Sequence, residues 1–139
     1  MEPAALAEFI AGGHFARHIR RTRELYRQRQ NDLIELASTI TGGLLEMRPA
    51  PAGMRLLGLL PLGVEASAVS WAASERGVLV TPISRAAPPS ITEGREGLLL
   101  GYAAYDRAAT ESALRVLAQV VREHASKARS ERAVLRQGA

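Results

Sequence analysis

Cysteine is absent from the 139 residues of the chain, and lysine occurs once, at Lys127. The chain therefore has no disulfide, no thiolate metal site and no cysteine nucleophile, and only one side chain on which a Schiff-base cofactor could form. No apolar run approaches the roughly 20 residues of a membrane-spanning helix. Glu2 and Glu8 flank the first apolar residues, which does not fit a signal peptide. We expect a cytoplasmic protein without a membrane partner.

Aromatic residues are also scarce, at 4% of the chain, whereas hydrophobic residues make up 47% and charged residues 23%. This balance is typical of a globular protein and not of a disordered one. The core must therefore be built mainly from leucine, valine, isoleucine and alanine. The length fits a single domain.

A helical period is the strongest pattern in the sequence. Side chains of one stripe recur at spacings of three and four, which predicts a long helix over 14–41. Gly42-Gly43 follows and is expected to end it. The stripe consists of Phe15, Ile19, Thr22, Tyr26, Leu33, Leu36, Ala37 and Ile40.

Short apolar runs bounded by turn residues predict extended segments. These segments are 44–48, 54–60, 78–83 and 97–105. The apolar residues expected to form the core of the sheet are Leu57, Leu59, Val78, Val80, Leu98 and Leu100.

Helices are predicted between and after these segments. Residues 65–76 are amphipathic and stop at Gly77, residues 85–95 are expected to form an exposed loop, and Asp106 can cap a last helix. The order of elements predicts an α+β fold, in which a small antiparallel or mixed sheet of three to four strands carries helices on one face.

We assign one domain to residues 1–125, with the long helix at 14–41 and the sheet and its helices at 44–123. A short helix over residues 2–10 precedes the break expected at Gly12-Gly13. The apolar pattern fades from about His124, so that 126–139 is expected to be a charged tail, solvated or frayed.

Candidates for chemistry are few. His14 and His18 lie one helical turn apart, a spacing that can bind a metal, but no third ligand is evident, and we assign no metal site. The three histidines have no recognisable serine or aspartate partner, and the glycine-rich pieces have no phosphate-loop pattern. We therefore assign no catalytic and no cofactor-binding residue.

A run of arginines follows the same helix and is opposed locally only by Glu24. Such a run can contact phosphates, form a solvated face or pair with an acidic neighbour. Sequence-specific DNA binding is not expected, because no helix-turn-helix or zinc finger is present. The run consists of Arg17, Arg20, Arg21, Arg23, Arg27 and Arg29.

Three blocks of the sequence resemble MocR-type transcription regulators of the GntR superfamily. Residues 6–21, followed by Tyr26, Arg29 and Asp32, are similar to the helix that joins the domains of these regulators, with Thr22 and Gln30 in place of Met and Arg. The second block, 51–61 and 76–84, resembles two central strands of their small domain, with Arg55 where His is common. The third is 97–103 with the last helix.

The resemblance implies the small domain of a fold-type-I aminotransferase module that binds pyridoxal phosphate. In the family, a large domain supplies the cofactor lysine and a separate winged helix-turn-helix binds DNA; the chain contains neither, and the cofactor is implied only for a full-length parent. Aminotransferases often carry a carboxylate-clamping arginine on the strand that matches residues 97–102. Leu99 occupies that position here, and Arg95 is the candidate substrate-binding residue that could reach the cleft.

The leading interpretation is thus the C-terminal small domain of such a regulator, as an excised fragment or a truncated gene product, not catalytic alone. Its expected partners are the parent's large domain and a second copy, bound through an apolar face that includes Leu6, Phe9 and Ile10. The alternatives are a stand-alone protein-interaction module with this fold and a small basic nucleic-acid-binding protein.

Overall fold

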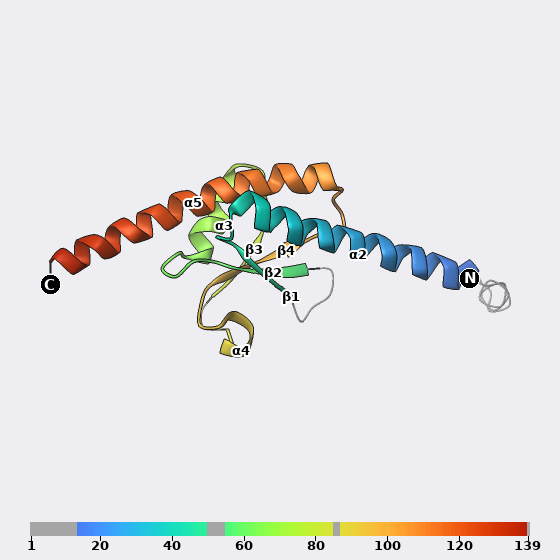
Figure 1. The fold of residues 1–139 in the computed structure, drawn as a ribbon, viewed down its shortest axis with the longest axis horizontal. Helices are drawn as coiled ribbons and strands as arrows, with labels where there is room; N and C mark the ends of the chain where they lie inside the picture. The colour runs from blue at the N-terminus through green and yellow to red at the C-terminus, as the bar shows by residue number, and fades with distance from the viewer. Residues whose placement is uncertain (1–13, 50–54, 85–86, 139) are drawn as a thin grey trace.

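An antiparallel sheet of four strands forms the centre of the chain in a computed structural model, which describes residues 14–49, 55–84 and 87–138 (Figure 1). The strands lie in the order β1-β2-β4-β3. The elements are α2 (His14–Thr41), β1 (Glu46–Pro49), β2 (Arg55–Leu59), α3 (Ala66–Glu75), β3 (Thr81–Ile83), α4 (Pro89–Thr92), β4 (Gly97–Gly101) and α5 (Arg107–Gln137). This architecture confirms the predicted α+β class, and α2 ends at the predicted residue, Thr41.

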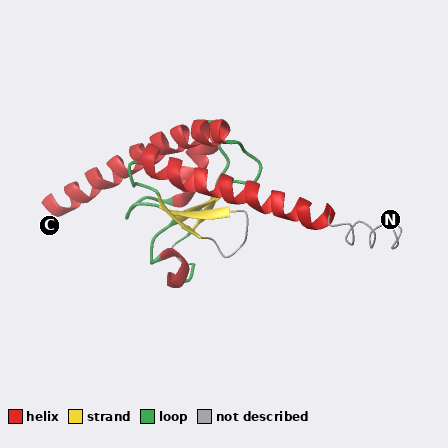
Figure 2. Cartoon of the chain, turned by 45° about the vertical axis from the view of Figure 1, so that its right-hand side comes forward, coloured by secondary structure: helices red, strands yellow, loops and turns green. Residues whose placement is uncertain are grey.

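The long helices α2 and α5 pack together over one face of the sheet, whereas α4 lies on the other side (Figures 1 and 2). The Arg107 guanidinium joins them through Asp32 (2.7 Å) and Glu35 (3.2 Å). Hydrogen bonds to Glu35 and then Asp32 raise the pKa of Arg107, which remains charged at neutral pH.

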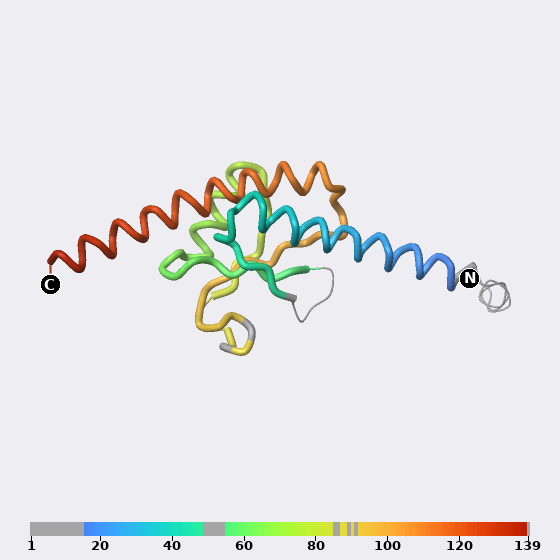
Figure 3. Tube along the Cα trace, in the orientation of Figure 1, coloured from blue at the N-terminus to red at the C-terminus, as the bar shows by residue number. Residues whose placement is uncertain are grey.

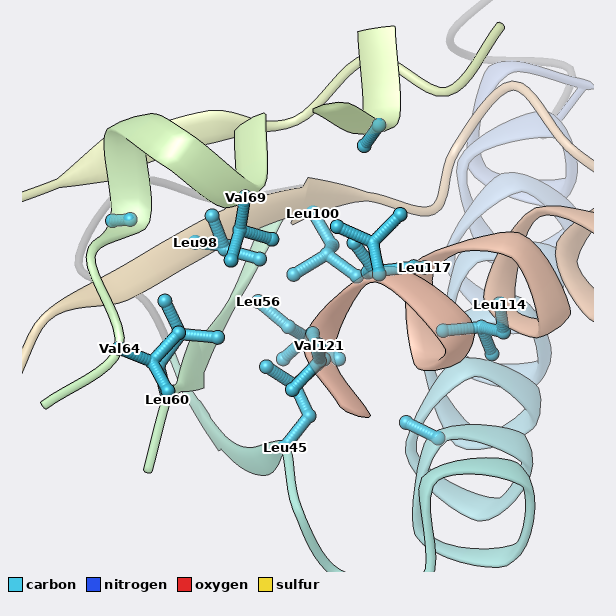
Figure 4. Close-up of a cluster of buried hydrophobic side chains, with 14 of the residues drawn as sticks. Leu45, Leu56, Leu60, Val64, Val69, Leu98, Leu100, Leu114, Leu117 and Val121 are labelled. Atoms are coloured by element: carbon cyan, nitrogen blue, oxygen red, sulfur yellow. The ribbon is translucent and has the colours of Figure 1, made fainter. Parts of the chain in front are cut away.

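Alternation along the two central strands divides their leucines between the faces. Leu56, Leu98 and Leu100 belong to the core under the helices, where α5 contributes Leu117 and Val121 (Figure 4). Leu57 and Leu59 point to the opposite face and are also buried. Four of the six predicted sheet-core residues are therefore fully enclosed, while Val78 and Val80 are partly buried against the core.

Turn and cap residues behave as the sequence predicts. Gly42 (φ 62°), Gly43 (φ 87°) and Gly77 (φ 84°) end α2 and α3 in left-handed conformations that other residues rarely adopt. The Asp106 carboxylate accepts a hydrogen bond from the Ala109 N–H (2.9 Å) at the start of α5. Asp106 thus caps α5.

The strand predicted over 78–83 is shorter than expected. Its first residues are bound to α3, because the Val78 N–H donates to the Ala73 carbonyl (2.9 Å) and the Ser70 hydroxyl donates to the Val80 carbonyl (2.9 Å). Only 81–83 remain to pair with β4. β4 itself ends at Gly101 and not at Tyr105, and the expected loop after β3 contains the short helix α4.

The last helix is longer than expected, since α5 continues to Gln137 and does not fade near His124 (Figure 3). Ala125 and Ala128 are buried, and the Arg132 guanidinium donates to the Leu62 carbonyl (2.6 Å). These contacts hold the first turns of the expected tail against the loop before α3. The tail at 126–137 is therefore helical and not frayed, while its residues other than Ala128 are exposed, as expected for a solvated tail.

Candidate functional site

The sheet face opposite α2 and α5, called the open face below, carries the residues that the sequence nominates for ligand contact. Leu99 pairs with Leu57 on one side and Thr81 on the other. Because Leu98 and Leu100 point into the core, Leu99 points to the open face, where it is half-buried. The position expected to hold a carboxylate-clamping arginine is therefore apolar.

A charged network lies on the same side of the sheet, along β1. Arg48 contacts Glu46 (3.3 Å) and Glu93 (3.4 Å), and Arg95 contacts Glu46 (3.2 Å). Two cations and two anions thus meet over the buried Leu57 and Leu59, which pair in register with Arg48 and Glu46. The network is balanced in charge and partly exposed, so its contribution to stability is modest.

Arg95 is fixed by contacts within the chain. Its Nε donates to the Leu60 carbonyl (2.9 Å), one Nη donates to the Leu59 carbonyl at 3.5 Å, and the other contacts Glu46. The side chain is only 17% exposed. These contacts tie the turn after α4 to the end of β2, which is a structural role. A substrate-binding role for Arg95 stays a prediction.

The described residues place no pyridoxal phosphate site around the one lysine of the chain. Lys127 is the one lysine of the sequence. It is exposed on the second half of α5, which extends past the sheet and does not belong to the open face. A lysine that forms a Schiff base lies in a pocket that holds the rest of the cofactor. The open face offers an apolar Leu99 and paired arginines instead.

No metal site emerges in the part of the chain that the structure describes, where no three histidine, aspartate, glutamate or cysteine side chains gather. His18 is exposed on α2, and the side chain of His14 lies outside what is described. The described helices also include none with the length and apolar character to cross a membrane. The apolar face predicted at Leu6, Phe9 and Ile10 lies outside the described residues.

A groove that the sequence did not reveal lies between α5 and the segment before β3. Its volume is about 340 Å³. Leu79, 84% exposed, and Tyr105 lie among its lining residues. The only sequence signal was Leu79 itself, an apolar residue between two valines of a predicted strand. The larger apolar lining residues are Leu33, Val78, Leu79, Val80, Leu100, Tyr105, Leu114 and Val116.

An ion pair borders this groove. Arg76, another lining residue, contacts Glu123 of α5 (3.1 Å). The hydrogen bond from Gln119, and then the Arg76 charge, hold the pKa of Glu123 below its ordinary value. The carboxylate therefore stays ionised to lower pH than usual, and this small stabilising effect is lost as the pH falls through the lowered pKa.

Comparison with known proteins relates the chain to transcription regulators. No family model matches it. It is 37% identical over 106 residues to the probable rhizopine catabolism regulatory protein MocR of Rhizobium meliloti, covering 74% of the chain and 20% of that protein. It is 32% identical over 100 residues to the uncharacterized HTH-type transcriptional regulator YhdI of Bacillus subtilis (strain 168), covering 70% and 20%. The chain thus spans about a fifth of the length of these curated relatives.

Solved aminotransferases share the fold. The alpha-aminoadipate aminotransferase LysN of Thermus thermophilus superimposes with a TM-score of 0.68 at 22% identity, covering 87% of the chain and 30% of that structure. The multiple substrate aminotransferase of Thermococcus profundus gives a TM-score of 0.68 at 19% identity, covering 86% and 29%. At these identities the likeness is one of fold alone.

Proposed function

Since the chain belongs to the family of MocR-type transcription regulators and shares the fold of part of an aminotransferase, we propose that it is the C-terminal small domain of such a regulator. The main support is how much of each chain the superposition covers. Nearly the whole of this chain superimposes on less than a third of an aminotransferase. A piece of that size corresponds to one domain of the two-domain fold. Its role is to close over a cofactor cleft formed with the large domain and to couple ligand binding to domain movement.

The open face is the side that we assign to this cleft. α2 and α5 cover the other face and bury Leu98 and Leu100, whereas on the open face Leu57 and Leu59 are buried but Leu99 remains partly exposed. With leucine at this position, the domain contributes apolar contact and not a bidentate clamp for a carboxylate. Arg95 is the remaining candidate for an anionic ligand, and it could serve only by leaving Glu46.

Pyridoxal phosphate belongs, in this proposal, to the full-length parent. The cofactor supplies an electrophilic carbonyl that a lysine of the large domain would bind, and the present chain holds no group for that purpose. The chain is therefore not catalytic alone. We also propose a cytoplasmic location, because a transcription regulator acts at the chromosome, and self-association as a dimer through exposed apolar surface.

The proposal is tested by a chimera in which this chain replaces the matching segment of the Rhizobium meliloti relative. We expect the purified chimera to show a visible absorbance band with pyridoxal phosphate that borohydride abolishes, and the isolated chain to show none. Lys127→Ala should leave the band of the chimera unchanged.

Two outcomes would contradict the proposal. One is a borohydride-sensitive band in the isolated chain that disappears in Lys127→Ala, because the cofactor would then bind here. The other is a folded chimera without any band although the intact relative has one, because the chain would then fail to replace the small domain.

A further inference from the structure

The first half of α2 carries a strongly cationic surface with no role in the fold. Arg17, Arg20, Arg21, Arg23 and Arg27 recur at spacings of three and four and therefore share one side of the helix. All five are exposed. They are called the arginine face below. The side chains on the opposite side of α2, such as Tyr26 and Leu33, contact the core.

The arginine face is nearly free of counter-charges. Its only carboxylate partner among the described residues is Glu24, which contacts Arg27 (3.3 Å) while both side chains remain about two-thirds exposed. Five cations thus face one anion. An exposed pair of this kind contributes little to stability.

Other arginines of the chain show that this arrangement is not general. Arg29, further along α2, donates to the Ala103 carbonyl, and Arg107 is bonded to two carboxylates of α2. Arg95 and Arg122 likewise bind backbone carbonyls. These four arginines are bonded within the domain, whereas Arg17, Arg20, Arg21 and Arg23 form no ion pair with the described residues.

The geometry leaves this surface accessible to a large partner. The first half of α2 extends past the sheet and past the start of α5 in both views (Figures 1 and 2). At 1.5 Å per residue, Arg17 and Arg27 are separated by about 15 Å along the helix axis. Duplex DNA carries one phosphate charge per roughly 1.7 Å of its axis, so a stretch of that length presents about nine phosphates.

We propose that the arginine face binds the phosphate backbone of duplex DNA without reading its sequence. Guanidinium groups suit phosphate because their fork of donors matches its oxygens. A protein partner is less well matched, since protein interfaces need an apolar centre, and Leu25, the exposed large apolar side chain of this stretch, lies beside the arginines and not among them. Single strands are less well matched too, because the described part of α2 places no aromatic side chain among these arginines for bases to stack on.

This inference is independent of the proposed function, because it concerns a surface on the helix and not the cofactor cleft. It adds a DNA contact to an aminotransferase-like region, in addition to any separate DNA-binding domain of a parent. Failure of the chimera test leaves it untouched, and its own failure leaves the chimera test untouched.

The experiment titrates the 139-residue chain against a fluorescein-labelled duplex of arbitrary sequence and follows anisotropy between about 50 and 200 mM salt. The test variant is Arg17→Gln/Arg20→Gln/Arg21→Gln. The control variant, Lys127→Gln/Arg129→Gln/Arg136→Gln, removes the same charge from exposed positions of α5. Circular dichroism checks that both variants keep their helix content.

We expect the parent chain to bind, with log affinity falling linearly as log salt rises. Each lost phosphate contact should lower the magnitude of that slope by about 0.9. The slope of the test variant, which loses three arginines, should therefore be smaller in magnitude by about 2.7. At about 50 mM salt its affinity should fall at least about tenfold, while the control keeps the parent's slope within about one unit.

Three results would overturn the proposal. The parent chain could fail to bind DNA at the lowest salt concentration. The two variants could lose affinity equally, which would indicate net charge and not this surface. The arginine face could bind vesicles of anionic lipid while ignoring DNA, which would assign it to a membrane surface.

Discussion

At the scale of single residues, Gly97 is the position on β4 where the sheet has least room. A Cβ added there would lie 2.9 Å from Leu57 Cδ1 and 3.1 Å from the Gly58 carbonyl oxygen. A side chain can shift, but the backbone oxygen belongs to a strand that pairs on both sides. We expect Gly97→Ala to lower the free energy of unfolding by about 1–3 kcal/mol, measured by urea denaturation.

Gly101 of the same strand supplies the control for this prediction. It is exposed, and a Cβ there meets nothing within 4 Å. Gly101→Ala should change the free energy of unfolding by less than about 0.5 kcal/mol. Equal losses in the two variants would show that crowding at Gly97 is not the cause.

Thr92 is a second residue whose environment leads to a prediction. It is fully buried at the end of α4, and its hydroxyl has no hydrogen-bond partner among the described residues. An unsatisfied buried hydroxyl is costly, whereas an apolar group of the same shape is not. We expect Thr92→Val to raise the free energy of unfolding by about 1 kcal/mol in the same assay. A loss of stability instead would mean that the hydroxyl is hydrogen-bonded in solution.

At the scale of the elements, β4 joins the two faces of the sheet. Leu100 points into the core, and its neighbour Leu99 points to the open face. We expect Leu100→Ala to cost about 2–5 kcal/mol of unfolding free energy, the usual range for a buried leucine. Leu99→Ala removes the same atoms from a half-buried site. It should lower the free energy of unfolding clearly less than Leu100→Ala does. If the two urea midpoints coincide, the assignment of faces is wrong.

α5 shows how far a helix can extend beyond its core. Its first half packs on α2 and the sheet, whereas toward its end Ala128 and Arg132 lie against the loop at Leu62 and Gly63. Val134 and Leu135 beyond these contacts are exposed. Contacts with the rest of the domain therefore become fewer from the first half of α5 toward its end.

At the scale of the whole molecule, two long helices extend past a small body on opposite sides (Figure 1). Apolar side chains elsewhere on the body are also exposed, including Trp71 of α3, 70% exposed, and Leu79 beside the groove. Exposed apolar patches on a small domain commonly mark interaction sites, and simple self-association is most often a two-fold dimer.

We therefore predict that analytical ultracentrifugation of the chain finds a dimer or larger species that moderate salt does not disperse, because apolar burial drives it. Phe9→Glu should weaken the species, as the sequence predicts, and Leu79→Glu serves as the comparison. If only Leu79→Glu weakens it, the groove is the interface. A monomer at high concentration contradicts the prediction. Dissociation of the dimer by salt alone would indicate that the arginine face, and not an apolar patch, forms the interface.

Local patterns in the sequence determined much of this protein. Periods of three and four predicted α2, and Asp106, Gly42 and Gly77 predicted where helices start and stop. These features depend on backbone conformation and on neighbours one turn away, which adjacent residues dictate. The three blocks of resemblance also identified the family, because they contain runs of particular residues and not only a pattern of polarity.

Only the tertiary structure decided the rest, since it depends on residues far apart in the chain. Arg95 was singled out in the sequence, but its bonds to Glu46, Leu59 and Leu60 require the folded sheet. Residues 78–80 have a strand's composition, yet contacts to α3 use their backbone. The extent of α5 follows from a loop 70 residues earlier. Burial and pairing of this kind are set by how elements pack, which no local spacing encodes.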